Sequence, residues 1–128
     1  MLPTNVLIVD DNVGFRRHVR SLLSSEAGIQ VIGEAGDGEQ AVFEAARLHP
    51  NLVLMDVRMP RMNGLEAARR LIGASSGTQV IILSQYDIDE YKQAAAESGA
   101  RDYVVKKSMM QKLVPAIQAA VSDTPLRG

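Results

Sequence analysis

The strongest apolar runs in this sequence end directly before polar side chains that can bind a metal ion or take part in group transfer. Three runs of four residues are rich in Val, Ile and Leu, and a weaker run ends before a lysine. The polar residues are Asp10 and Asp11 after residues 6–9, Asp56 after residues 52–55, Ser84 after residues 80–83 and Lys106 after residues 101–105. A single aspartate in such a place is more often a turn former or helix cap, but turns alone do not explain the whole combination.

The chemistry that these five side chains share is that of phosphoryl transfer. Carboxylates that lie close together cannot all stay ionised unless a cation neutralises them. Oxygen ligands without His or Cys favour a hard cation, and Mg²⁺ works beside phosphate groups. One carboxylate can then act as a nucleophile toward a phosphoryl group and form an acyl phosphate. The metal, the hydroxyl and the lysine would stabilise charge on the transferring oxygens.

Short buried strands and amphipathic helices are predicted to bring these residues together. Continuous apolar runs are typical of strands buried on both faces of a parallel sheet, and weaker strands are predicted at residues 31–34 and 101–105. Apolar residues spaced three and four apart predict helices over residues 13–25, 38–48, 64–74 and 88–98, and a last helix opening at Ser108. Five alternations predict a doubly wound α/β sandwich, whose ligand site lies beyond the carboxyl ends of the strands.

The boundaries of the first and last helices are predicted from caps and from one proline. Gly28 follows the first helix, where a C-terminal cap is expected. Ser108 and Gln111 have capping-box spacing at the start of the last helix. Pro115 removes a hydrogen bond in a helix interior, so this helix either kinks there or begins later. Its predicted buried stripe is Met110, Leu113, Val114, Ile117 and Val121.

Length, composition and charge predict a single globular domain. The chain has 128 residues, 46% of them hydrophobic, and a net charge of −1, which gives no reason to expect binding to nucleic acid or membranes by this domain itself. It has no cysteine, no bilayer-length apolar run and no signal-peptide pattern, so we expect a cytoplasmic protein. Residues 1–122 are predicted to form the domain and residues 123–128 a linker or disordered tail. The basic residues of the first helix are interpreted as a solvated face, with a partner contact as the alternative: Arg16, Arg17 and Arg20.

Four segments resemble motifs of the two-component response-regulator receiver family. Residues 56–66 (DVRMPRMNGLE) resemble its phosphorylation loop, and residues 7–11 (LIVDD) resemble its acidic pair. Residues 82–84 (ILS) are similar to its switch-hydroxyl strand, and residues 99–106 (GARDYVVK) to its aromatic-and-lysine strand. The resemblance covers residues 5–122 and implies the family's flavodoxin-like fold, a five-stranded parallel sheet of order 2-1-3-4-5.

The resemblance also implies a phosphoacceptor and a metal site. Asp56 is expected to accept a phosphoryl group from a histidine of a sensor kinase. Asp11, Asp56 and the main-chain carbonyl of Arg58 are expected to bind Mg²⁺ directly, with Asp10 acting largely through water. The chain would assist its own phosphorylation and dephosphorylation without being an enzyme that turns over an independent substrate.

Three further residues are expected to respond to the phosphoryl group. By resemblance, Lys106 would hold one phosphoryl oxygen, and Ser84 would turn to bond another. Tyr103 would then move inward into the space that the hydroxyl leaves. These movements would change the surface of the domain and so transmit the signal.

Several positions depart from the usual residues of the family. Lys107 stands where many members have a proline, which puts a cis peptide after Lys106 in doubt. Gln85 stands where a small residue is common, which predicts narrower access to the phosphoryl group. Arg58 and Tyr86 occupy positions that tune the lifetime of the phosphorylated state in the family. Both side chains are large here, so slow self-dephosphorylation is predicted.

Two alternative functions remain open at this point. An aspartyl-phosphate phosphatase of the haloacid-dehalogenase type also uses strand-end aspartates, a hydroxyl and a lysine. It needs an Asp-x-Asp motif after its first strand, however, whereas Asp10 and Asp11 are adjacent. Phosphorylation of Asp10 would support the phosphatase, and phosphorylation of Asp56 the receiver. A receiver-shaped interaction domain that works without phosphate is the other alternative, and loss of Mg²⁺ binding would support it.

The segments around the switch residues suggest what the domain controls. Residues 83–87 (LSQYD) and 106–108 (KKS) resemble receivers attached to LuxR-type helix-turn-helix output domains. A transcription regulator is therefore expected, with DNA contacted only through an output domain outside this chain; a stand-alone receiver is the alternative. The expected partners are a sensor histidine kinase and a second copy of the chain on phosphorylation.

Overall fold

The computed structural model describes residues 2–74 and 77–122, in which strands and helices alternate. The strands are β1 (Thr4–Val9), β2 (Ile29–Ala35), β3 (Leu52–Met55), β4 (Gln79–Ser84) and β5 (Asp102–Val105). The helices are α1 (Val13–Ser24), α2 (Gly38–Leu48), α3 (Gly64–Ala74), α4 (Asp89–Glu97) and α5 (Met109–Ser122), with a 3₁₀ turn, η1 (Lys106–Ser108), before α5. Every predicted strand and helix is present, with boundaries within a few residues of those expected.

The strands form one parallel sheet of order β2-β1-β3-β4-β5, which confirms the predicted topology. Its register decides which residues meet at the carboxyl edge. Val9 of β1 pairs with Met55 of β3, so Asp10 and Asp56, the next residue of each strand, leave the sheet side by side. Across the sheet, Ser84 pairs with the last residue of β5, which places Lys106 at the same edge.

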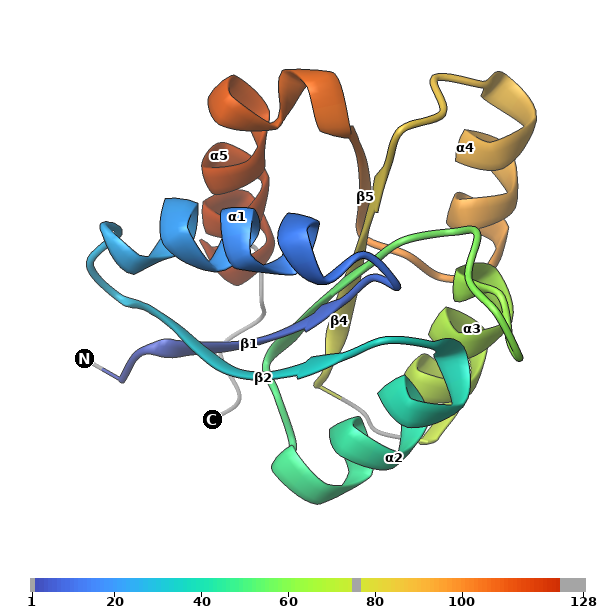
Figure 1. Ribbon diagram of the computed structural model, residues 1–128, viewed down its shortest axis with the longest axis horizontal. Helices are drawn as coiled ribbons and strands as arrows, with labels where there is room; N and C mark the ends of the chain where they lie inside the picture. Colours follow the sequence, from blue (N-terminus) through green and yellow to red (C-terminus); the bar gives the residue numbers. More distant parts are fainter. Residues whose placement is uncertain (1, 75–76, 123–128) are drawn as a thin grey trace.

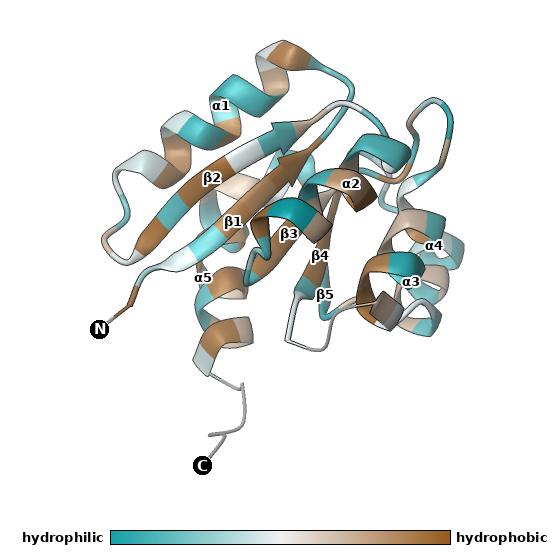
Figure 2. Cartoon of the chain, turned by 90° about the horizontal axis from the view of Figure 1, so that it is seen from below, coloured by the Kyte–Doolittle hydropathy of each residue, from teal (hydrophilic) through white to brown (hydrophobic). Residues whose placement is uncertain are grey.

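Helices cover both faces of the sheet and divide the apolar side chains into two cores (Figure 1). Helices α1 and α5 pack on one face, where Leu23 and Leu113 are fully buried against strand residues such as Ile8. Helices α2, α3 and α4 pack on the other face. β3 is apolar along its whole length, and β4 is apolar between its two end residues (Figure 2), because both faces of these strands are covered.

Short polar side chains start three of the helices beside the carboxyl edge. Asn12, Asp37 and Asn63 each accept a hydrogen bond from the main-chain N–H three residues later, at 2.8 to 2.9 Å. Such caps satisfy main-chain donors that have no partner inside a helix. They fix where α1, α2 and α3 begin, and therefore the length of the loops that carry the strand-end residues.

The predicted buried stripe of α5 is partly wrong. Leu113 and Ile117 are buried, but Met110 is 63% exposed and Val121 is 43% exposed. Met109, Ala116 and Ala120 take the inward positions instead. The helix begins directly after η1, and this entry turns Met109 toward the sheet. Sequence periodicity could not choose between two adjacent methionines.

Other boundary predictions for the first and last helices have mixed outcomes. The first helix ends at Ser24 with Ser25 as its cap, so the prediction that Gly28 caps it is wrong. Gly28 adopts φ +86° and accepts a hydrogen bond from the N–H of Thr4, which makes it the turn into β2. The last helix follows Ser108 and contains Pro115, so it does not begin later; within the described residues, Ser108 and Gln111 form no capping-box hydrogen bonds.

Two further expectations concern a membrane span and the end of the chain. None of the helices within residues 2–74 and 77–122 is long and apolar enough to cross a membrane. The predicted linker or tail at residues 123–128 lies outside the described part of the chain.

Candidate functional site

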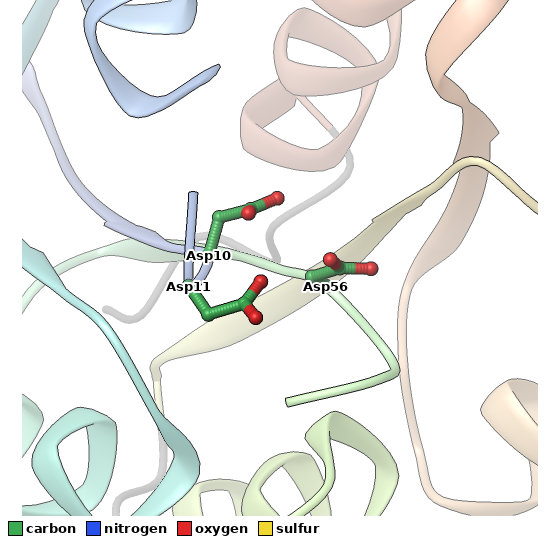
Figure 3. A group of neighbouring side chains, drawn as sticks. All are labelled: Asp10, Asp11 and Asp56. Atoms are coloured by element: carbon green, nitrogen blue, oxygen red, sulfur yellow. The ribbon is translucent and has the colours of Figure 1, made fainter. Parts of the chain in front are cut away.

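Three carboxylates meet where β1 and β3 end, as predicted (Figure 3). Asp10 and Asp56 are 2% and 8% exposed, whereas Asp11 is exposed. One oxygen from each carboxylate lies within 4.8 Å of the other two. The cluster follows from the strand register, because the first residues beyond paired strands must leave the sheet at neighbouring points.

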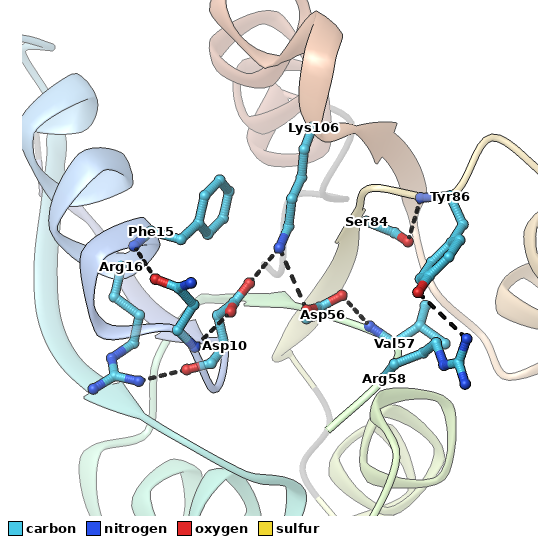
Figure 4. A network of polar contacts seen from close by, with 10 residues as sticks. Asp10, Phe15, Arg16, Asp56, Val57, Arg58, Ser84, Tyr86 and Lys106 are labelled. Atoms are coloured by element: carbon cyan, nitrogen blue, oxygen red, sulfur yellow. Dashed lines mark hydrogen bonds and ion pairs between the residues drawn. The ribbon is translucent and has the colours of Figure 1, made fainter. Parts of the chain in front are cut away.

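Lys106 reaches this cluster from the opposite side of the cleft (Figure 4). Its Nζ donates to Oδ2 of Asp10 at 2.6 Å and lies 3.4 Å from Oδ2 of Asp56. The ring of Phe15, in the first turn of α1, lies 3.9 Å from the same Nζ atom. The ammonium group is therefore held by the carboxylate of Asp10 and the ring of Phe15, and it lies beside the carboxylate of Asp56.

Burial makes Asp56 a weaker acid than an exposed aspartate. Removal from water raises its pKa to about 6, and the neighbouring charge of Asp10 acts in the same direction. Lys106 and a 2.8 Å hydrogen bond from the N–H of Val57 oppose this shift. Lys106 compensates the charge of the Asp56 carboxylate only in part, and a bound cation would compensate it further.

The three carboxylates differ in how much of their binding capacity the protein already uses. Asp10 accepts from Lys106 with one oxygen and from the N–H of Asn12 with the other. Asp11 has no hydrogen-bond or ion-pair partner among the described residues. The donor set holds only oxygen atoms, which suits a hard cation such as Mg²⁺. Asp11 has the most capacity left to bind it, and Oδ2 of Asp56 is engaged only by the longer 3.4 Å contact with Lys106.

The predicted switch residues lie next to the cluster and share one partner. Ser84 is fully buried at the end of β4, and its Oγ accepts a hydrogen bond from the N–H of Tyr86 at 3.1 Å. The hydroxyl of half-buried Tyr103 donates to the main-chain carbonyl of Tyr86 at 2.5 Å. Burial raises the pKa of Tyr103, so its hydroxyl keeps its proton at neutral pH. Both switch residues are thus bonded to the loop after β4.

The three residues predicted to tune the phosphorylated state form one rim of the cleft. Arg58, Gln85 and Tyr86 line a cleft of about 360 Å³ together with the carboxylates and Lys106. The guanidinium of Arg58 stands 5.4 Å from the centre of the Tyr86 ring and donates to its hydroxyl at 3.3 Å. Tyr86 in turn packs edge-on against Tyr91, with ring centres 5.5 Å apart. Side-chain contacts therefore connect Arg58, Tyr86 and Tyr91 at this rim.

The loop after Asp56 depends on a close approach between backbones. A side-chain carbon at Gly64 would lie only 1.7 Å from the main-chain oxygen of Asp56. The N–H of Gly64 also donates to the carbonyl of Val57 at 2.7 Å. Glycine is required at this point. No cis peptide bond occurs among the described residues, in agreement with the doubt that Lys107 raised.

Two site residues were not identified from the sequence. Phe15 was assigned only to the apolar face of its helix, and its contact with Lys106 was not foreseen. Arg16 was interpreted as part of a solvated basic face, but its side chain is only 15% exposed and binds Glu34. Arg20 binds the same glutamate but stays exposed, so the solvated-face interpretation is wrong for Arg16 alone of these two arginines. The available signal was the place of Phe15 and Arg16 in the first turn of the helix that follows the acidic pair.

Comparison with known families decides what kind of site this is. The family model of the response regulator receiver domain matches residues 6–118. The chain belongs to the response-regulator receiver family. As a receiver domain it is a phosphorylation-dependent switch of two-component signalling, and the match does not favour the phosphatase alternative.

Relatives and solved structures agree with this assignment. The transcriptional regulatory protein PdtaR of Mycobacterium tuberculosis is 39% identical over 122 residues, which are 94% of this receiver and 58% of PdtaR. A LuxR-family response regulator from Aurantimonas sp. SI85-9A1 has a TM-score of 0.90 and 29% identity, covering 94% of this chain and 86% of that one. A complex of CheX and CheY with BeF3 and Mg²⁺ from Borrelia burgdorferi has a TM-score of 0.87 and 27% identity, covering 94% and 90%.

The receiver matches only part of these longer relatives. It spans between 48% and 58% of the length of the transcriptional regulatory proteins that it resembles. Other relatives are protein-glutamate methylesterases, of which it covers 27% and 28%. Receivers of this family therefore accompany different outputs, and most of these relatives are transcription regulators.

Proposed function

We propose that this receiver is switched by phosphorylation of Asp56, with a sensor histidine kinase as the donor and Mg²⁺ as the cofactor. The observation that carries the proposal is the meeting of three carboxylates and Lys106 at one sheet edge. Asp10 and Asp56 are both buried, close to the lysine ammonium and part of the lining of the cleft. Lys106 binds Asp10 more closely, at 2.6 Å against 3.4 Å for Asp56, so Asp10 is proposed to be the poorer nucleophile.

The transfer step follows from this arrangement. A carboxylate oxygen of Asp56 attacks the phosphorus atom of a phosphohistidine, and the bond between that phosphorus and the histidine nitrogen breaks. The nitrogen keeps the electron pair and takes up a proton, and Asp56 becomes an acyl phosphate. The ammonium of Lys106, 3.4 Å from Asp56, is placed to bind a phosphoryl oxygen. Stabilising charge on the transferring group is the main requirement of such a reaction.

The metal would be held by oxygen atoms on the open side of the cluster. Asp11, Asp56 and the main-chain carbonyl of Arg58 are proposed as direct ligands, and Asp10 as an indirect one that acts through water. When bound, Mg²⁺ supplies positive charge that neutralises the carboxylates and the incoming phosphoryl group. The Borrelia CheY structure, solved with BeF3 and Mg²⁺, supports this assignment.

The phosphoryl group is proposed to act on Ser84 and then on Tyr103. For Ser84 to bond a phosphoryl oxygen, its hydroxyl must turn and give up the hydrogen bond from the N–H of Tyr86. That bond ties the loop after β4 to the strand, and the same loop holds the hydroxyl of Tyr103. Movement of Ser84 would therefore free this loop, and Tyr103 would move inward with it.

The rim residues are proposed to slow the loss of the phosphoryl group. Hydrolysis needs a water molecule beside the phosphorus atom, and Arg58, Gln85 and Tyr86 line the cleft through which it would come. The contact between the first and last of these closes part of this path. We expect the purified phosphorylated chain to lose its phosphate over minutes or longer rather than within seconds.

The output is proposed to be transcription, through a DNA-binding domain outside this chain. The length difference from the transcriptional regulators and the similarity to a LuxR-family structure support this proposal. A homodimer formed on phosphorylation would couple the switch to DNA binding, and the cytoplasm is the proposed location. A stand-alone receiver is the alternative, and the reading frame beyond residue 128 would decide between them.

Acetyl phosphate provides a test of the phosphoacceptor without the cognate kinase. Wild-type chain incubated with acetyl phosphate and Mg²⁺ should gain the mass of one phosphoryl group, and fragmentation should place it on Asp56. The Asp56→Asn variant should gain none, and omission of Mg²⁺ with a chelator should strongly reduce labelling. Labelling of Asp10 instead would support phosphatase chemistry, and Mg²⁺-independent labelling would contradict the proposed metal site.

A further inference from the structure

The side chain of Arg16 lies behind the acidic cluster and joins three elements of the fold. It belongs to the first turn of α1, and its Nε donates to Oε1 of Glu34 on β2 at 2.8 Å. Its Nη1 donates to the main-chain carbonyl of Asp10 (Figure 4). Only 15% of the arginine side chain is exposed. Among the described residues, it makes no hydrogen bond or ion pair with a carboxylate of the cluster, so it holds the backbone of the acidic loop rather than its charges.

The carbonyl that Arg16 binds belongs to the peptide between the two acidic residues. β1 ends at Val9, and the N–H of Asp10 still donates to Ala35 of β2 at 3.0 Å. The carbonyl of Asp10 has left the sheet, and Arg16 takes the place of a strand partner for it. Asp11 lacks a side-chain partner within residues 2–74 and 77–122, so the backbone alone directs its carboxylate. Rotation of this one peptide would swing Asp11 away from Asp56.

Glu34 holds Arg16 in the orientation that this contact requires. Arginine loses considerable side-chain freedom when it is fixed, and the planar guanidinium can bind a carboxylate and a carbonyl at once. Burial works against ionisation of Glu34, but the hydrogen bonds and charges of Arg16 and Arg20 outweigh it and lower its pKa. Glu34 is therefore a carboxylate at neutral pH, and it balances the arginine charge so close to the metal site.

We propose that Arg16, oriented by Glu34, is a positioning residue for Mg²⁺: it fixes the Asp10–Asp11 peptide so that Asp11 faces Asp56 before the metal arrives. This inference rests on the proposed function, because it concerns the same metal site. It adds two residues outside the cleft to the set that determines metal affinity. The competing interpretation is that Arg16 and Glu34 only tie α1 to β2, with no effect on the metal.

Arg20 provides a matched control for this proposal. Its Nε donates to the other oxygen of Glu34, also at 2.8 Å, and its side chain is 46% exposed. Arg16→Gln and Arg20→Gln each remove one positive charge and one ion pair with the same glutamate. Only Arg16→Gln also removes the hydrogen bond to Asp10. A difference between the two variants therefore reports on the acidic loop and not on the tie between α1 and β2.

The test is Mg²⁺ binding by the full chain, measured by isothermal titration calorimetry. Arg16→Gln should weaken Mg²⁺ binding by about tenfold, the usual effect of removing a group that orients a metal ligand. Arg20→Gln should change the dissociation constant by less than about twofold, as expected for an exposed ion pair. In phosphorylation by acetyl phosphate, Arg16→Gln should need more Mg²⁺ for half-maximal rate but reach nearly the wild-type rate at saturation.

Further variants keep the test decisive if Arg16→Gln does not fold. Arg16→Lys keeps the charge but lacks the planar group whose separate nitrogens bind Glu34 and Asp10. Glu34→Gln removes the carboxylate that orients the arginine. Both variants should bind Mg²⁺ more weakly. Thermal unfolding in a chelator checks that each variant is folded. Equal Mg²⁺ affinity in Arg16→Gln and Arg20→Gln, or unchanged affinity in Arg16→Lys and Glu34→Gln, overturns the inference. If wild-type chain itself bound no Mg²⁺ and Asp56 stayed unlabelled, the proposed function would fail instead.

Discussion

Replacing Asp56 with asparagine should make the metal-free protein more stable at pH 7. Asp56→Asn removes a buried negative charge but keeps the size of the side chain. Its amide oxygen can still accept the hydrogen bond from the N–H of Val57. The substitution loses the 3.4 Å contact with Lys106, but this lysine keeps its shorter bond to Asp10. The change therefore isolates the energetic effect of holding Asp56 ionised in the folded state.

The magnitude follows from the raised pKa of Asp56. The difference between its ordinary value of 3.8 and about 6 corresponds to about 3 kcal/mol of destabilisation at neutral pH. Solvent in the open cleft screens part of this energy, so we expect the variant to gain about 1 to 2 kcal/mol in free energy of unfolding. For a domain of this size, the midpoint of thermal unfolding should rise by about 3 to 8 °C.

The pH dependence provides the decisive signature. Because the pKa of Asp56 is raised in the folded state, the folded protein binds this proton more tightly than the unfolded chain. Lowering the pH therefore stabilises wild type with respect to this group, beginning near pH 6 and complete below about pH 4. The advantage of Asp56→Asn should be full at pH 7 and should disappear near pH 4.

Urea unfolding in the presence of a chelator, at a series of pH values, measures this difference. Asp11→Asn removes a charge from the same cluster at an exposed position, and it should change stability by less than about 0.5 kcal/mol. If Asp56→Asn were no more stable than wild type at pH 7, the argument from burial would be refuted. An advantage that stayed constant down to pH 4 would show that its origin is not the ionised carboxylate.

Three other substitutions test separate parts of the site. Gly64→Ala should destabilise the chain by about 3 kcal/mol or more, because its methyl group would overlap the main-chain oxygen of Asp56; urea unfolding measures this. Phe15→Leu should slow labelling by acetyl phosphate about two- to fivefold, because the ring contact with Lys106 is lost, whereas Phe15→Tyr should keep the rate. Arg58→Ala should shorten the half-life of the acyl phosphate on the order of tenfold if the rim adds about 1.4 kcal/mol to the hydrolysis barrier. An unchanged half-life, measured by loss of the phosphoryl mass, would remove Arg58 from the rim's function.

The strands could be predicted because their physical requirements leave little choice, whereas their order was implied by the resemblance to the receiver family. A four-residue apolar run such as residues 52–55 is too short for a helix and too apolar for an exposed loop. Once such runs alternate with amphipathic helices, a right-handed parallel sheet follows, and the residues after the strands must share one edge. Asp10, Asp56, Ser84 and Lys106 were therefore placed together correctly from the sequence.

The pairings within the site could not be predicted in the same way. The sequence brought Lys106 to the correct edge but did not show that it binds Asp10 more closely than Asp56. The two distances from Lys106, 2.6 Å to Asp10 and 3.4 Å to Asp56, differ too little for a sequence pattern to rank them. Arg16 and Glu34 are eighteen residues apart, and only the packing of α1 beside β2 makes them neighbours. The spacing of charged residues along a helix does not predict which residue of another element each of them will bind.

Mg²⁺ should reverse the order of stability between wild type and Asp56→Asn. The same crowding of carboxylates that weakens the metal-free protein creates the site for the cation, so binding should remove the penalty. At a Mg²⁺ concentration one hundred times its dissociation constant, wild type should gain about 2.7 kcal/mol. The variant lacks one proposed ligand and should gain much less. Urea unfolding of both proteins with and without Mg²⁺ tests this; an equal gain in both would show that the ion does not bind through Asp56.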